Sequence, residues 1–116
     1  MPIDRDKALS QSYPDGEGHY GPDDAILYHL GVGAGVPATD PGELEYTYEK
    51  NLKVLPSFAV VAAGSFSGRA RKESRGGGNL RAIEGIDFNP ATLLHGEQEI
   101  ELHQPLPTAA NFSISS

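Results

Sequence analysis

An aspartate and a histidine in the second half of the chain are residue types that could share acid–base work. Asp87 opens the run Asp87-Phe88-Asn89-Pro90, and His95 lies further downstream. A carboxylate and an imidazole that share one water could hydrate a double bond, because one takes a proton while the other gives one. Asp-x-Asn-Pro is also common turn chemistry, since Asp and Asn side chains bond to nearby backbone. The pattern alone leaves both interpretations open.

His95 also lies in a run that alternates between polar and apolar residues. One side of the run consists of Leu94, Gly96, Gln98, Ile100 and Leu102, and the other of His95, Glu97, Glu99, Glu101 and His103. The alternation predicts a strand with one polar face, which the prolines after it end. Side chains on such a face project in parallel about 6–7 Å apart, so one metal ion would need ligands from another element. We therefore expect no metal site and interpret the polar face as solvated or inter-domain.

The part of the chain that precedes this strand begins with a polar segment. Residues 1–21 are interrupted by prolines and glycines, which predicts an extended N-terminal arm. A short helix is expected over Pro22–Leu30, because proline suits a first helical turn and two aspartates suit the positive end of the helix dipole. Its apolar stripe consists of Ile26, Leu27 and Leu30.

The glycines after this helix suggest a dinucleotide-binding loop, and we reject that interpretation. The fingerprint needs a strand before Gly31-x-Gly33-x-Gly35 and a helix after it, whereas here a helix precedes and Pro37 follows. Gly31 is expected at the C′ position of the helix and the rest in a tight turn. Glu43–Glu49 then predicts a strand, with Leu44, Tyr46 and Tyr48 on one face.

A second helix is expected after Pro56, although a buried strand remains an alternative. Ser57–Ala63 has no charged residue, so we expect it to be buried all round and to be the most buried stretch of the chain. Residues 64–81 predict a flexible loop rich in glycine and arginine. The alternation of Phe112 and Ile114 predicts the first residues of another strand.

The composition sets limits on the class of protein. At 116 residues the chain is one domain or part of one, and its net charge of −7 argues against a nucleic-acid or anionic-membrane partner. It has no cysteine, which excludes disulfides and Cys-based zinc sites. Its first residues lack the apolar core of a signal peptide, and its longest apolar run is far too short to span a bilayer. We expect a soluble, cytoplasmic protein, or a peroxisomal one in a eukaryote.

Four stretches, in order, resemble the N-terminal half of the hydratase 2 (MaoC-like, (3R)-specific enoyl-CoA hydratase) family, which also occurs in peroxisomal multifunctional enzyme type 2. They are residues 24–35 (DAILYHLGVGAG), 44–49 (LEYTYE), 54–60 (VLPSFAV) and 88–98 (FNPATLLHGEQ). The resemblance implies an α+β fold, the hot dog, in which an antiparallel sheet wraps on a helix. Residues 22–116 would then form a partial N-terminal hot-dog domain, the incomplete first half of a double hot dog.

The resemblance also implies an activity, the reversible hydration of trans-2-enoyl-CoA to (3R)-3-hydroxyacyl-CoA in fatty-acid metabolism. The family's catalytic Asp and His lie in its C-terminal half, where a single aliphatic residue separates Pro from His. Here four residues separate Pro90 from His95, so we expect no catalytic pair in this chain. His95 and Gly96 match the position at which the family's first half touches acyl-CoA, and they are the predicted substrate-binding residues.

These expectations lead to one main interpretation and a rival. The chain is interpreted as the substrate-shaping part of an (R)-specific enoyl-CoA hydratase, a lyase that is inactive alone and needs a second hot-dog half or a homodimer. No cofactor is expected, since coenzyme A would enter as part of the substrate. The alternative is a non-catalytic hot-dog-like module that binds acyl-thioesters or a protein partner. A small interaction domain that uses the acidic strand face is a third interpretation.

Overall fold

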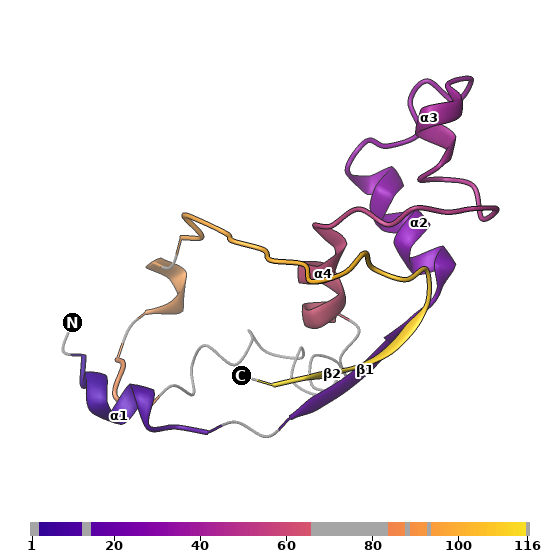
Figure 1. Ribbon diagram of the computed structural model, residues 1–116. Helices are drawn as coiled ribbons and strands as arrows, with labels where there is room; N and C mark the ends of the chain where they lie inside the picture. Colours follow the sequence, from indigo (N-terminus) through magenta and orange to yellow (C-terminus); the bar gives the residue numbers. More distant parts are fainter. Residues whose placement is uncertain (1–2, 13–14, 66–83, 88, 93, 116) are drawn as a thin grey trace.

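The computed structural model describes residues 3–12, 15–65, 84–87, 89–92 and 94–115 (Figure 1). Short elements alternate along the chain: α1 (Arg5–Leu9), β1 (Gly16–Tyr20), α2 (Pro22–Gly31), α3 (Pro41–Leu44), α4 (Phe58–Ser65), the 3₁₀ helix η2 (Pro90–Thr92) and β2 (Ala110–Ile114). The Cα radius of gyration is 17.4 Å, against about 13 Å for a compact domain of this length. The predicted loop over residues 64–81 lies almost entirely outside the described residues.

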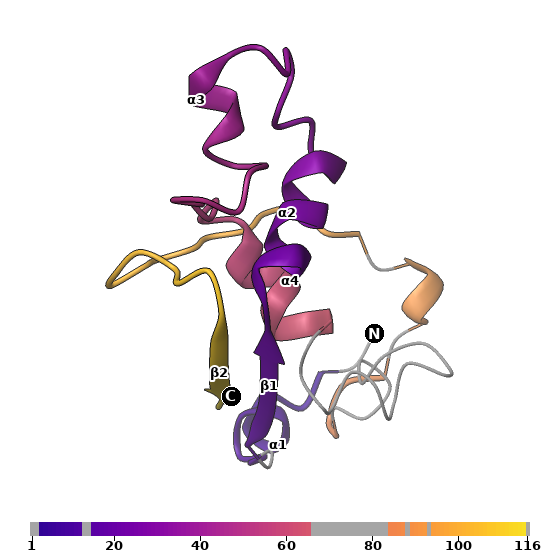
Figure 2. The same cartoon turned by 90° about the vertical axis from the view of Figure 1, so that its right-hand side faces the viewer.

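The sheet joins two strands from opposite ends of the chain. β1 and β2 pair antiparallel, with Gly16 opposite Ile114 and Tyr20 opposite Ala110 (Figure 2). Phe112 and Ile114 are half-buried while their neighbours along β2 are exposed, as a strand with one covered face requires. The strand predicted from these two residues is confirmed.

A small aromatic core lies where α2 and α4 meet this sheet. Its buried apolar members are Tyr20, Ala25, Leu52, Phe58 and Ala62. The Phe58 ring packs edge-on against Tyr20 at a centroid distance of 4.9 Å, and the Tyr28 ring lies 5.5 Å from it. Perpendicular aromatic pairs of this kind bury large apolar areas in a preferred geometry. The core therefore holds β1, α2 and α4 together.

The helix predicted at Pro22 is confirmed, and local bonds explain both of its ends. Asp24 accepts a hydrogen bond from the Gly21 N–H at 2.9 Å, which caps the first turn. At the other end Gly33 N–H donates to Leu30 C=O and Ala34 N–H donates to His29 C=O, the pair of bonds of a Schellman motif. Gly33 has φ +93°, so it, and not the predicted Gly31, occupies the C′ position.

The predicted apolar stripe of α2 is wrong in part. Leu27 and Leu30 are 71% and 55% exposed, whereas Ala25 and His29 are buried and Ile26 is half-buried. The spacing of apolar residues alone did not determine which side of the helix faces the core. Packing against Phe58 and the bonds of the His29 ring select the other side.

The strand predicted over Glu43–Glu49 is also wrong. Asp40 accepts a hydrogen bond from the Gly42 N–H at 2.8 Å and Pro41 begins α3, which is a strong helix start. The next N–H groups donate to carbonyls three or four residues back, as Tyr48 N–H does to Leu44. Local turns thus satisfy backbone groups that a strand would have paired with a neighbour.

The N-terminal 21 residues are not simply an extended arm. Asp4 accepts a hydrogen bond from the Lys7 N–H at 3.1 Å and begins α1, and β1 follows as part of the sheet. The local sequence signal for α1 was this N-cap aspartate. The division between an arm and a domain at residue 21 remains a prediction.

The second predicted helix is confirmed as α4, and the alternative of a buried strand is excluded. Phe58 and Ala62, one turn apart, are buried, while Val60 is 43% exposed and Ser57 is also exposed. The helix is therefore covered on one side only, and the expectation that it is buried all round is wrong. Together these helices and the antiparallel pair form an α+β arrangement that is compatible with a hot-dog fold.

Candidate functional site

The predicted substrate-binding residues lie on an exposed stretch between η2 and β2. His95 and Gly96 are both exposed, and a Cβ placed on Gly96 would meet no atom within 4 Å. Leu94 beside them is 90% exposed. The stretch runs as an extended trace (Figure 1), and no strand of the described residues pairs with it. The assignment of His95 and Gly96 to a ligand remains a prediction.

The strand predicted over Leu94–His103 is not formed among the residues that the structure describes. His95 Nε2 lies 3.0 Å from Gln98 Oε1, although residues three apart point to opposite faces of a regular strand. A strand needs a neighbour to bond its N–H and C=O groups. This stretch has the alternation of a strand, but no described segment pairs with it.

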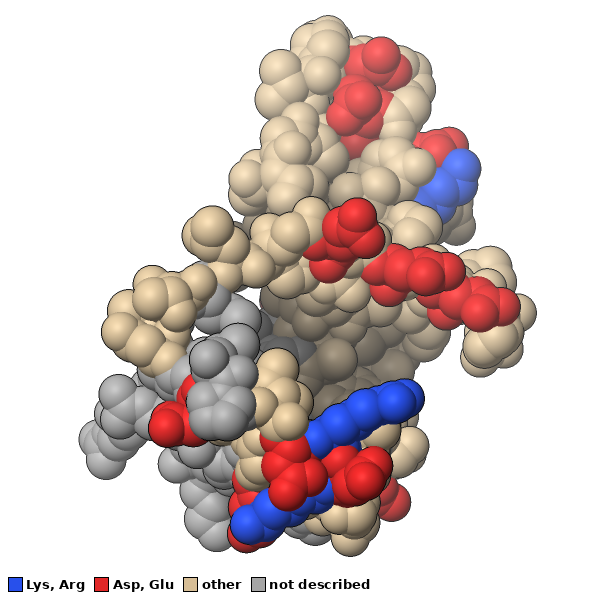
Figure 3. Space-filling view, turned by 90° about the vertical axis from the view of Figure 1, so that its left-hand side faces the viewer, with Lys and Arg blue, Asp and Glu red and all other residues tan. Residues whose placement is uncertain are grey.

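The polar side chains of this stretch do not converge. Glu97, Glu99 and Glu101 are exposed, and the 3.9 Å approach of His103 Nδ1 to Glu101 Oε1 joins side chains that are more than 80% exposed. Such surface pairs contribute little stability. Acidic side chains outnumber basic ones on the face in Figure 3. Within the described ranges no three metal-ligating side chains gather closely enough to hold an ion.

Asp87 and His95 do not form an acid–base pair in this arrangement. Asp87 is exposed, and no hydrogen bond or ion pair joins it to His95 in the part of the chain that the structure describes. Between them Asn89 accepts a hydrogen bond from the Ala91 N–H at 3.0 Å and starts η2. Asp-x-Asn-Pro here performs turn chemistry, the second of the two interpretations that its sequence allowed.

Both ends of the exposed stretch are attached to the rest of the molecule. Downstream, the Tyr20 hydroxyl donates to the Pro107 carbonyl at 2.7 Å, and Leu106 packs against the core. Upstream, Asp4 N–H donates to the Gly85 carbonyl at 2.7 Å. Burial raises the pKa of the Tyr20 phenol, which keeps its proton on the donor side of this bond.

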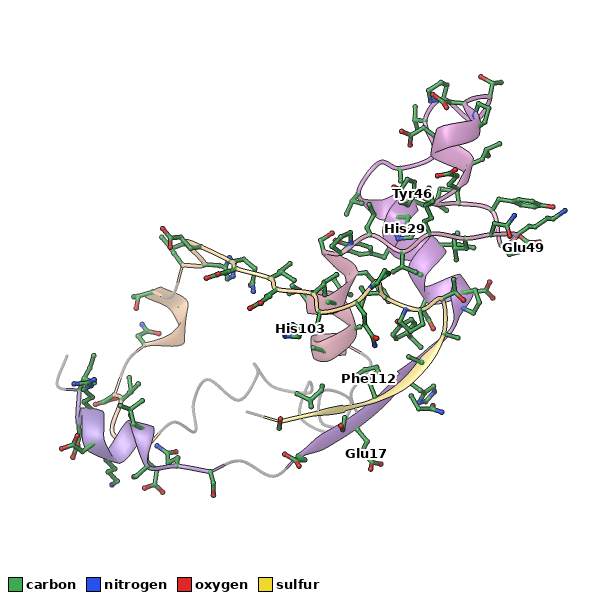
Figure 4. The ribbon with its side chains drawn as sticks, in the orientation of Figure 1. Glu17, His29, Tyr46, Glu49, His103 and Phe112 are labelled. Carbon is green, nitrogen blue, oxygen red and sulfur yellow. The ribbon has the colours of Figure 1, made fainter. Side chains whose placement is uncertain are left out.

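A histidine that is not among the predicted site residues is fully buried. His29 has 0% exposure and sits between two chain segments. Its Nδ1 lies 2.6 Å from the Tyr46 carbonyl, and its Nε2 accepts a hydrogen bond from the Leu55 N–H at 3.0 Å. Figure 4 shows His29 beside Tyr46, with His103 on a different part of the molecule. The one available signal was its position four residues after Ala25, on the same side of α2.

These bonds determine the chemical form of the His29 ring. A carbonyl can only accept and an N–H can only donate, so Nδ1 carries the proton, Nε2 has a free lone pair and the ring is neutral. With both nitrogens bonded to backbone, neither is available for a substrate. His29 therefore braces α2 against the segment from Tyr46 to Leu55. Lys53 in this segment pairs with Glu45, and the hydrogen bond with that carboxylate raises the Lys53 pKa.

The described helices are all too short or too polar to cross a membrane. This statement applies to the residues that the structure describes.

The chain is similar to one protein family and to several curated proteins. The family model of the MFE-2 hydratase 2 N-terminal domain matches residues 19–116. The chain is 38% identical over 95 residues to 3-hydroxyacyl-thioester dehydratase Y of Mycobacterium tuberculosis, covering 78% of this chain and 27% of that protein. It is 36% identical over 102 residues to peroxisomal multifunctional enzyme type 2 of Mus musculus, covering 86% of this chain and 12% of that protein.

A plant relative also matches most of this chain. Enoyl-CoA hydratase 2, peroxisomal, of Arabidopsis thaliana is 33% identical over 112 residues, which cover 91% of this chain and 33% of that protein. The chain thus spans between 12% and 33% of the length of these three relatives.

Proposed function

Because the chain belongs to the family of MFE-2 hydratase 2 N-terminal domains, we propose that it is the substrate-shaping portion of an (R)-specific enoyl-CoA hydratase. The reaction would add water reversibly to trans-2-enoyl-CoA and give (3R)-3-hydroxyacyl-CoA. Coenzyme A enters as part of the substrate. The observation that carries the proposal is the family match over residues 19–116, supported by relatives named as hydratases and a dehydratase.

We assign this chain a binding role rather than the acid–base step. Proton transfer needs two groups within hydrogen-bond reach of one water. Asp87 and His95 are both exposed, and His95 instead pairs with Gln98. The acid–base pair would then come from a second hot-dog half or from a second copy of the chain.

His95 and Gly96 are the residues proposed to meet the acyl-CoA. A backbone without a side chain at Gly96 lets a thioester or amide of the ligand approach its N–H and C=O groups closely. No atom lies within 4 Å of a Cβ placed on Gly96. Both residues are therefore free to form the wall of a site whose remaining surface comes from elsewhere.

The proposal is tested by measuring the hydration of crotonyl-CoA by the purified chain, alone and mixed with the C-terminal half of a homologous hydratase 2. We expect no turnover by the chain alone and turnover by the mixture above that of the added half alone. Turnover by the chain alone that disappears in Asp87→Asn would restore Asp87 and His95 as a pair. Binding of 3-hydroxyacyl-CoA without any turnover by the mixture would favour the non-catalytic acyl-thioester module. No binding and no turnover would contradict the proposed function.

A further inference from the structure

The segment Ile3–Gln11 contacts a segment far along the chain. Ile3 and Ile86 form an isolated antiparallel bridge, and Asp4 N–H donates to the Gly85 carbonyl at 2.7 Å. Lys7 Nζ lies 3.5 Å from Glu84 Oε2. The family match begins only at residue 19, so the N-terminal side of this contact lies outside it and the Glu84–Ile86 side lies within it.

Gln11 completes the contact through its side-chain amide. Its Nε2 donates to the Glu84 carbonyl at 2.7 Å, and its Oε1 accepts from the Glu84 N–H at 3.1 Å. The amide thus bonds both backbone groups of Glu84, as the backbone of a neighbouring strand would. A glutamate at position 11 would lack the donor, and an asparagine would have a shorter side chain.

Gly85 is required on the other side of the contact. It has φ +87°, a conformation that side chains disfavour. A Cβ there would lie 2.7 Å from the Asp4 carbonyl oxygen and 3.1 Å from the Ala8 nitrogen. Position 85 therefore accepts no side chain while the N-terminal segment is docked.

The contact is polar and contains little buried apolar surface. α1 has no buried residue, and Ile3 and Leu9 are 56% and 71% exposed. Elements held by exposed hydrogen bonds alone open more readily than the core. The N-terminal segment can therefore detach while the aromatic core stays folded.

We propose that Ile3–Gln11 is a polar latch that closes on Glu84–Ile86 and positions the segment leading to His95 and Gly96. Its place in the chain supports this role. Among the described residues, the exposed stretch is held downstream by the bond from Tyr20 to Pro107 and upstream by the latch, so opening the latch removes its upstream contact. The latch itself stands on these contacts, and only its consequence for acyl-CoA binding rests on the proposed function.

The first test is amide hydrogen exchange at Glu84 in the 116-residue chain. Gln11→Ala removes the acceptor of the Glu84 N–H, and we expect exchange there to become about 5-fold faster or more. Gly85→Ala disrupts the contact from its other side and should speed exchange at Asp4, whose N–H is bonded to the Gly85 carbonyl. Ser12→Ala, an exposed neighbour of Gln11, is the matched control and should leave both rates unchanged. Unchanged rates in Gln11→Ala and Gly85→Ala would overturn the latch.

The second test measures position. The chain has no cysteine, so spin labels can be attached at Leu27→Cys, which is exposed on α2, and Ala91→Cys, which is exposed in η2. We expect the distribution of distances between the labels to broaden in Gln11→Ala and to stay unchanged in Ser12→Ala. Faster exchange at Glu84 with an unchanged distribution would show that the contact does not position η2, and would overturn the proposal. Neither measurement uses a ligand, so a failure to bind 3-hydroxyacyl-CoA would contradict only the proposed function.

Discussion

At the scale of single residues, two histidines of one chain have opposite surroundings. His29 is fully buried with both ring nitrogens bonded to backbone, whereas His95 is exposed and bonded to the side chain of Gln98. A ring whose lone pair and N–H are both used by backbone is a structural brace. A ring held by one exposed side chain can exchange that partner for a ligand. The accessible histidine is therefore the better candidate for substrate binding.

Substitutions at His95 and Gly96 should affect ligand binding more than folding. Because Gly96 has open space around its Cβ position, Gly96→Val should leave the free energy of unfolding nearly unchanged while blocking approach to the backbone. We expect the Kd for 3-hydroxyacyl-CoA, measured with the assembled two-half protein, to rise about 10-fold in Gly96→Val and about 3-fold in His95→Ala. Urea unfolding of each variant is the control. Unchanged Kd values in both would remove these residues from the site.

Tyr20 makes stability depend on pH in alkaline solution. Burial raises the Tyr20 pKa above its ordinary value of 10.0, so above pH 10 the unfolded chain loses this proton before the folded one does. The contribution of Tyr20 is therefore fully present below pH 10 and is lost as pH rises through the folded pKa. Tyr20→Phe should cost about 0.5–1.5 kcal/mol at pH 7, through the bond to Pro107, and should reduce the alkaline loss. Tyr48→Phe, half-exposed, should retain the full loss, and identical pH profiles for both variants would exclude this role.

At the scale of elements, the helices of this chain form from hydrogen bonds between nearby residues, whereas its strands need a partner segment. α2 forms where local caps predict it, because its backbone bonds connect residues a few positions apart. The alternating stretch after η2 has no strand partner among the described segments, because its ladder bonds must come from another part of the chain. α4 differs from both, because its packing against the core decides which of its side chains are buried.

Phe58 should contribute most of the stability that α4 supplies. Its side chain has 0% exposure and contacts the rings of Tyr20 and Tyr28. We expect Phe58→Ala to lower the free energy of unfolding by about 3–5 kcal/mol, and Val60→Ala, at a 43% exposed position of the same helix, by under about 1 kcal/mol. Urea unfolding measures both. If Phe58→Ala does not fold, Phe58→Leu should still cost more than Val60→Ala, and equal costs would contradict the one-sided packing of α4.

At the scale of the whole molecule, the folded chain leaves a large solvent-accessible area exposed. Its accessible area is 9004 Å², whereas a folded monomer of 12.3 kDa has about 6100 Å². In the part of the chain that the structure describes, the core has five buried apolar residues, which supply a small hydrophobic contribution. A partner that covers this surface should therefore stabilise the fold.

We accordingly expect the Tm of the chain to rise on addition of the C-terminal half of a homologous hydratase 2. A partner that binds only the folded state stabilises it by about 2.7 kcal/mol at a concentration 100 times its Kd. Serum albumin at the same concentration is the control for crowding. A Tm that instead rises with the concentration of the chain alone would identify a homodimer, and a Tm that responds to neither would contradict the need for a second half.

The sequence by itself determined the features that depend on nearby residues. Pro22 and Asp24 predicted the start of α2, Pro56 predicted α4, and the alternation of Phe112 and Ile114 predicted β2. The ordered stretches that resemble hydratase 2 predicted the family that the comparisons show. The proposed site, His95 and Gly96, also comes from this resemblance, and the structure adds that both residues are exposed.

Only the tertiary structure decided the features that depend on distant residues. β1 pairs with a strand from the far end of the chain, and Gln11 bonds a residue 73 positions away. Sequence alternation cannot say whether a strand finds a partner, because ladder bonds join segments that the pattern does not relate. Nor can helical spacing say whether Leu27 or His29 faces the core, since that choice depends on Phe58, Tyr46 and Leu55 across the fold.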